Sequence, residues 1–272
     1  GSTYIGHFEE FARSQPLPLT DILINPRDGA MYFTIGGRRV QSAIYRVTYT
    51  GKLSPSPAPT KKAKTEGDQY RQHRRVLEAH LRKQSSPASK EALDQIWQSL
   101  GSPDRGIRHA ARAALEKQPV INWQQRIENE KRPATASAAL IALARADKGK
   151  SARLILEKAT TFDYSNIQNP QYRLDLLRAI TLALTRGGMP ATATKIKLTT
   201  WLDGFYPAKT PEENRDLSTI TAFLQAPYAV RKTMSLLENA PGQEEQITYA
   251  INLRFMKRGW TAELRKKYFR WF

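Results

Sequence analysis

The sequence contains no cysteine, and this absence excludes several kinds of chemistry within these residues. Without thiols the chain can form no disulfide, no iron–sulfur cluster, no Cys-ligated zinc site and no thioether link to haem c. Histidine is scarce as well, so a metal site would need three of the four histidines, or carboxylates, to converge. His73 and His80 are seven residues apart and can share a helix face, and we interpret them as ordinary helix positions.

Long apolar runs and the common catalytic signatures are also missing. No stretch approaches the roughly 18 apolar residues that a membrane-spanning helix needs. The sequence has no GxSxG, HExxH or GxxxxGK[ST] motif. No secretory targeting segment is recognisable, and we interpret Gly1-Ser2 as a cloning remnant. These observations predict a chain without catalytic activity of its own.

Acidic residues are under-represented, with 25 against 43 lysines and arginines, which gives a formal net charge of +18. Such a chain attracts anions: nucleic acid, acidic polysaccharide, a membrane surface or an acidic protein. The charge does not choose among them. A solvated basic surface without a dedicated partner remains an equal alternative.

The first 51 residues predict a small antiparallel β-meander. Val, Ile, Tyr, Phe and Thr alternate there with polar residues, and Asn25–Gly29 has the Pro and Asp-Gly composition of a tight turn. Residues 52–66 follow, with prolines at 55, 57 and 59 and several lysines, and predict an extended linker. The predicted strands are Asp21–Ile24, Ala30–Ile35 and Ala43–Thr50.

Residues 67–272 change to a helical period that continues to the end of the chain. Ser86-Pro87, Ser102-Pro103-Asp104 and Thr210-Pro211-Glu212-Glu213 carry the composition of helix starts. The predicted helices are Asp68–Lys83, Ser89–Leu100, Arg105–Lys117, Trp123–Glu130, Thr135–Ala146, Lys150–Ala159, Pro170–Arg186, Thr192–Phe205, Pro211–Leu224, Tyr228–Glu238, Glu244–Arg258 and Thr261–Phe272.

A repeat-like pattern refines this prediction. In residues 99–119 one helix closes with a small Gly101, and the next combines Asp104 and Arg108 with a stripe of alanines. HEAT repeats have this pattern, and we expect Asp104 and Arg108 to form ion pairs across adjacent repeats. Fainter copies occur at 134–147 and 176–186. The sequence therefore predicts a mainly α protein, a HEAT-like α-solenoid of antiparallel helix pairs, with a compact irregular helical bundle as the alternative.

The C-terminus is the best candidate for binding an anion or docking a partner. Arg and Lys interleaved with aromatics can track phosphates and stack bases. The same pattern is typical of a last helix whose aromatics pack on the neighbouring helices or on another domain, and of a plain solvated face. The candidate residues are Arg254, Lys257, Arg258, Trp260, Arg265, Lys266, Lys267, Arg270 and Trp271, with Tyr268 and Phe269 between them.

Two further clusters have simpler interpretations. A basic set on the first predicted helix indicates an exposed capping helix; it comprises Arg71, Arg74, Arg75, Arg82 and Lys83. HEAT-like DNA glycosylases suggest an enzyme hypothesis, in which an aromatic and a carboxylate converge around an extruded base. Trp97 with Asp94, or Trp201 with Asp203, would have to take that role. Both tryptophans lie on apolar helix faces, so we interpret them as core residues.

Three segments also resemble a known family. Residues 15–52, QPLPLTDILINPRDGAMYFTIGGRRVQSAIYRVTYTGK, resemble the last blade of the sugar-dehydrogenase-like β-propeller in large modular proteins of planctomycetes and related bacteria. SLGSPDRGIRHAARAALEKQP with INWQQR, and the C-terminal segment that begins at Ala240, resemble the helical region that links this propeller to a haem-binding cytochrome c domain.

The resemblance implies a periplasmic or otherwise extracytoplasmic redox protein. It places haem c, and allows for a quinone cofactor, only in domains outside this chain, and no catalytic or haem-ligand residue carries over to any position here. The function it predicts is a non-catalytic interdomain or protein-interaction scaffold, whose partners are neighbouring domains of the same parent. The alternative is a basic solenoid that binds nucleic acid or another polyanion.

Overall fold

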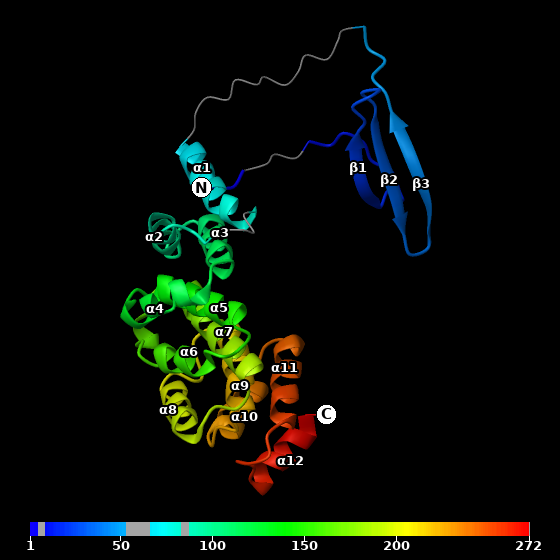
Figure 1. The fold of residues 1–272 in the computed structure, drawn as a ribbon. Helices are drawn as coiled ribbons and strands as arrows, with labels where there is room; N and C mark the ends of the chain where they lie inside the picture. Colours follow the sequence, from blue (N-terminus) through cyan, green and yellow to red (C-terminus); the bar gives the residue numbers. More distant parts are fainter. Residues whose placement is uncertain (5–8, 53–65, 83–86, 272) are drawn as a thin grey trace. The chain divides into compact units, whose positions relative to one another are not determined.

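A computed structural model describes residues 1–4, 9–52, 66–82 and 87–271. The chain is mainly helical, with one three-stranded antiparallel sheet (Figure 1). Its contacts divide it into two compact units: Thr3–Thr65, and Gly1–Ser2 together with Glu66–Phe272. We call these the sheet unit and the helical unit. The predicted linker at 52–66 falls almost wholly outside the described residues.

The sheet unit contains the predicted meander, β1 (Leu19–Ile24), β2 (Met31–Gly37) and β3 (Val40–Val47), paired in that order. The β1–β2 turn forms as its composition predicts. The Asn25 side chain accepts a hydrogen bond from the Arg27 N–H, the Asp28 side chain accepts one from the Ala30 N–H, and Gly29 takes a φ of 65°.

Few side chains of the sheet are buried. Ala30 and Ile35 are, whereas Ile22 and Leu23, which are neighbours on β1 and therefore point to opposite faces, are both more than half exposed. The described strands thus build only a small core, and the stability that a sheet gains from burying one face is limited here.

The helical unit contains all twelve predicted helices. Most bounds agree within two residues, but α11 ends at Arg254 and not at Arg258, because Phe255 is its C-cap and the chain then turns through Gly259 at φ 86°. The helices are α1 (Glu66–Arg82), α2 (Lys90–Ser99), α3 (Arg105–Glu116), α4 (Gln125–Asn129), α5 (Pro133–Ala146), α6 (Ala152–Ala159), α7 (Pro170–Gly187), α8 (Thr192–Asp203), α9 (Pro211–Phe223), α10 (Ala229–Asn239), α11 (Gln243–Arg254) and α12 (Ala262–Trp271).

Two of the three predicted helix starts are confirmed. Thr210 caps α9 by accepting a hydrogen bond from the Glu213 N–H, and Pro211 occupies the first turn. Ser102-Pro103-Asp104 precedes α3, and Asp104 caps that helix by accepting a hydrogen bond from the Ile107 N–H. Ser86 of the third start lies outside the described residues, and Ser89 is the residue that caps α2.

The odd-numbered helices contact one another in chain order: α1 with α3, α3 with α5, and onward through α7 and α9 to α11. Even-numbered helices pack on this row, α2 against α3, α6 against α7 and α10 against α11. Alanines allow the row to be close-packed, because α5 buries Ala136, Ala139 and Ala142 completely. One buried cluster runs from Leu77 to Leu224, and a second fills the space between α10, α11 and α12.

Candidate interaction surfaces of the helical unit

The predicted C-terminal cluster is basic at its surface and aromatic beneath. All seven of its lysines and arginines are exposed, whereas Trp260 and Trp271 are half-buried and Tyr268 is buried. The polar atoms of these three rings bond to the helical unit itself: the Trp260 indole donates to the Met256 carbonyl at 2.9 Å, and the Tyr268 hydroxyl to that of Ala250 at 3.0 Å. Trp271 donates to the Gln246 side chain at 3.2 Å. Tyr268 and Trp271 thus connect α12 to α11, and Trp260 bonds within the turn between the two helices.

Only part of the cluster converges. A hollow of about 440 Å³, which we call the C-terminal hollow, is lined by Arg254, Lys257, Trp260 and Arg265, together with the exposed Phe269. The remaining candidates do not line it, and Lys267 instead lies 3.3 Å from the Glu238 carboxylate. Those that stay outside are Arg258, Lys266, Lys267, Arg270 and Trp271.

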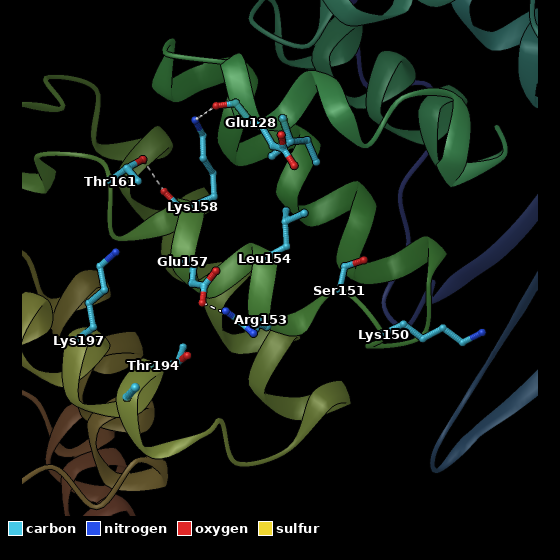
Figure 2. Close-up of a pocket in the computed structure, with 12 residues that line it drawn as sticks. Glu128, Lys150, Ser151, Arg153, Leu154, Glu157, Lys158, Thr161, Thr194 and Lys197 are labelled. Atoms are coloured by element: carbon cyan, nitrogen blue, oxygen red, sulfur yellow. Dashed lines mark hydrogen bonds and ion pairs between the residues drawn. The ribbon is translucent and has the colours of Figure 1, made fainter.

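A larger hollow of about 750 Å³ lies between α4, α6 and α8, and we call it the α6 hollow (Figure 2). Three of its six charged side chains have a partner: Arg153 pairs with Glu157 at 2.8 Å, and the Lys158 amine donates to the backbone carbonyl of Glu128 at 2.9 Å. Burial lowers the pKa of Lys158. Figure 2 shows Lys150 extending away from the other labelled side chains. The lysines of this hollow therefore do not converge on one position.

A third hollow, of about 340 Å³, crosses the odd-numbered row at α3, α5 and α7, and we call it the arginine hollow. Its lining has an apolar part formed by Ala138, Ile141 and Leu182. Five arginines line it against one carboxylate, Asp175. The arginines are Arg105, Arg108 and Arg112 of α3, Arg145 of α5 and Arg178 of α7.

One carboxylate is already bound beside the arginine hollow. Glu116 accepts from Arg112 at 3.0 Å and from Arg145 at 2.9 Å, so a single side chain bridges α3 and α5. Arg105 and Arg178 are exposed and make no ion pair that the described residues show within 4 Å. Sequence reasoning did not identify this site, although Arg105, Arg108 and Arg112 recur at helical spacing on one face.

Asp104 and Arg108 do not form the ion pairs expected across adjacent repeats. Asp104 caps α3 and accepts two hydrogen bonds from Ser2; burial raises the pKa of its carboxyl, but these bonds outweigh burial and bring it to about 2. Arg108 donates to the carbonyls of Ser102 and Pro103 in its own turn, and its guanidinium lies 5.6 Å from the Tyr172 ring of α7. Each residue organises the start of α3 separately.

The two carboxylates of the enzyme hypothesis form ion pairs, and the two tryptophans donate hydrogen bonds to other elements of the helical unit. Asp94 pairs with Arg126 at 2.6 Å, and the Trp97 indole donates to Glu130 at 3.0 Å. Trp201 donates to the Phe162 carbonyl at 3.0 Å. Asp203 pairs with Lys232. These contacts support the interpretation of both tryptophans as core residues.

On α1, the described members of the first basic cluster are partly paired, Arg71 with Asp68 and Arg74 with Glu78, both at 2.7 Å. Residue 83 and the side chain of residue 82 fall outside the described structure. Among the described residues, no three His, Asp or Glu side chains gather as a metal site would require. None of the described helices is both long and apolar enough to cross a membrane.

No protein-family model matches the chain, and neither a curated protein nor a solved structure matches it. The surfaces described above are therefore the basis for assigning a function.

Proposed function

We propose that the helical unit is a HEAT-like α-solenoid that serves as a non-catalytic interdomain or protein-interaction scaffold. The observation that carries this proposal is the sequence of helix contacts. Each odd-numbered helix packs on the next odd-numbered helix, and the even-numbered helices pack on that row. A stack in which each helix pair contacts its neighbours is the arrangement of repeat proteins, which use their extended surfaces to bind other proteins.

Ion pairs between successive helix pairs support the same proposal. Arg126 of α4 reaches Asp94 of α2, and Lys232 of α10 reaches Asp203 of α8, so even-numbered helices are tied to the next even-numbered helix. The odd-numbered row has equivalent ties, with Glu116 of α3 bound to α5 and Glu213 of α9 bound to α7. Ion pairs that recur between helices two apart in chain order are expected of stacked helix pairs and not of an irregular bundle.

Distance measurements between two spin labels test the stack. Because the chain has no cysteine, cysteines introduced at the exposed Arg75 of α1 and Arg254 of α11 label specifically. Five steps between neighbouring helices of about 8–10 Å each predict a separation of about 40–50 Å, less any curvature of the row. A separation of one or two steps would overturn the solenoid.

The larger parent that we propose is an extracytoplasmic redox protein with a propeller-type dehydrogenase and a cytochrome c domain. This step rests on the resemblance of residues 15–52, 99–119 and 240–272. The residues of this chain do not fit covalent haem c, since none is a cysteine, so the haem would be held by another domain. In that parent, exchanging residues 66–272 for a flexible linker should leave haem absorbance unchanged and slow electron transfer between the domains.

The rival function is polyanion binding, and the observation that favours it is the net charge of +18. Titration with a fluorescent duplex oligonucleotide and with an acidic polysaccharide, at about 50 and about 200 mM salt, separates the two. A scaffold should lose both ligands at the higher salt. Micromolar binding that persists at the higher salt would favour the rival.

A further inference from the structure

We infer that the arginine hollow is the docking site for an acidic protein segment that places an apolar side chain between carboxylates. The inference rests on the proposed scaffold function and names its binding surface and the chemistry of its partner. Its basis is the juxtaposition of five arginines from three successive odd-numbered helices around an apolar patch.

The cations of the hollow suit an oxyanion. All the lysine and arginine side chains that line it are arginines, whose planar guanidinium groups can bind carboxylates and phosphates with two parallel hydrogen bonds. Glu116 shows that a carboxylate fits between them, because its two oxygens each accept one hydrogen bond, from Arg112 and from Arg145 on a different helix. Arg105 and Arg178 flank this pair on α3 and α7 with their guanidinium groups exposed to solvent.

The lining argues against a nucleic-acid backbone. The apolar part of the lining is a nearly buried floor, with Ala138 and Ile141 each 7% exposed, beside the half-buried Leu182, and a Leu or Phe side chain can contact it whereas a chain of phosphates cannot. No Phe, Tyr or Trp side chain is among the residues that line the hollow, and its one aromatic ring, the imidazole of His109, lies 3.1 Å from Arg112 through its Nδ1.

The charge of the whole chain adds to this complementarity. A net charge of +18 attracts an acidic partner to the protein surface. The local positive charge of the arginine hollow then favours docking at that position. The α6 hollow is larger, but its Arg153 is paired with Glu157 and its lysines diverge. The arginine hollow is therefore the better site for a short acidic segment.

The test is fluorescence anisotropy with the full chain and a labelled Glu-rich peptide that carries two Leu residues. The variant Arg105→Gln/Arg178→Gln removes two exposed charges, and Lys150→Gln/Lys197→Gln removes the same charge at the α6 hollow as the matched control. We expect peptide binding about tenfold weaker in the arginine variant and unchanged in the lysine variant, with both melting at the wild-type temperature. A peptide with Gln in place of Glu should not compete.

The other outcomes are distinguishable. Equal weakening by both variants, or no binding of the peptide by wild type, overturns the docking site and leaves the scaffold proposal to its distance measurement. Duplex DNA that displaces the peptide at about 200 mM salt, with the same dependence on Arg105 and Arg178, overturns the acidic-protein partner and the scaffold function together.

Discussion

At the scale of single residues, two buried carboxylates of the helical unit, Glu213 and Glu130, bind side chains from other elements. Glu213 of α9 is nearly inaccessible, with a side chain 2% exposed, and accepts from Arg173 at 2.6 Å, from the Tyr164 hydroxyl at 2.7 Å and from Thr210 at 2.8 Å. Burial raises the pKa of the Glu213 carboxyl. The hydrogen bonds from Arg173, Tyr164 and Thr210 lower that pKa by more, so it lies below its ordinary value. The carboxylate is therefore charged and fully satisfied.

Glu213→Ala should destabilise the helical unit by about 3–5 kcal/mol, because it leaves the largely buried Arg173 without its counter-charge. The free energy of unfolding in urea, followed by tryptophan fluorescence, measures the loss. Glu157→Ala breaks the exposed pair with Arg153 and should cost far less, because water screens that pair. Equal costs for the two variants would contradict the assigned role of Glu213.

Glu130 predicts how stability depends on pH. Burial raises the pKa of its carboxyl, but hydrogen bonds from the Arg132 side chain and N–H and from the Trp97 indole outweigh burial and lower it to about 2, against an ordinary 4.5. The folded state thus holds the proton more weakly than the unfolded state. Its contribution to stability is fully present above about pH 4.5 and is lost as the pH falls toward about 2.

Glu130→Gln should therefore flatten the decline of the unfolding free energy between about pH 5 and pH 2, besides lowering stability at neutral pH. Urea titrations at a series of pH values provide the curve. Glu128→Gln removes a neighbouring exposed carboxylate and serves as the control, which should keep the wild-type slope. An unchanged slope in Glu130→Gln would show that other carboxylates govern acid unfolding.

At the scale of elements, the turn after α2 packs against the start of α5 with no room for a side chain. A Cβ added to Gly101 would lie 2.7 Å from the Thr135 hydroxyl oxygen. Thr135 is completely buried, and its hydroxyl is the one buried side-chain polar atom in the described residues without a hydrogen-bond partner. The close approach of Thr135 therefore explains why residue 101 is a glycine, and the Thr135 hydroxyl is left without a hydrogen bond.

A double-mutant cycle measures this contact. Gly101→Ala should cost about 1–3 kcal/mol in wild type, because the new methyl group overpacks the site. In a Thr135→Ala background the oxygen is absent and the same change should cost little, so the coupling energy approaches the cost of the single variant. Additive effects of the two substitutions would exclude the contact as the reason for glycine.

The elements themselves were largely predictable, because their signals are local. Apolar periodicity and Pro or Gly at the breaks located all twelve helices and the three strands. Helix ends were less certain than helix positions, as at α11, which ends at Arg254 where the pattern predicted Arg258. The arginine hollow could not be predicted, since Arg112, Arg145 and Arg178 come together only through the packing of α3, α5 and α7. The ion pairs expected of Asp104 and Arg108 with adjacent repeats do not form, because Ser2 and the Ile107 N–H bind Asp104 and the carbonyls of Ser102 and Pro103 bind Arg108.

At the scale of the whole molecule, the two units differ in how much surface they bury. The helical unit has two buried clusters that together include residues of all its helices, whereas the described residues of the sheet unit bury only Ala30 and Ile35 among their apolar side chains. Contacts are concentrated within each unit. A unit whose stabilising contacts are its own can unfold on its own, so we expect the sheet unit to unfold while the helical unit stays folded.

The sequence provides separate probes for the two units, because all five tryptophans lie in the helical unit. In urea, tryptophan fluorescence should report one transition of the helical unit, and hydrogen exchange of the β2 amides should show loss of protection at a lower urea concentration. In water, the β2 amides should exchange faster than those of α5 and α7, which are surrounded by neighbouring helices. Coincident loss of protection in β2 and α5 would mean that the two units unfold as one cooperative body, and the division inferred from their contacts would then be wrong.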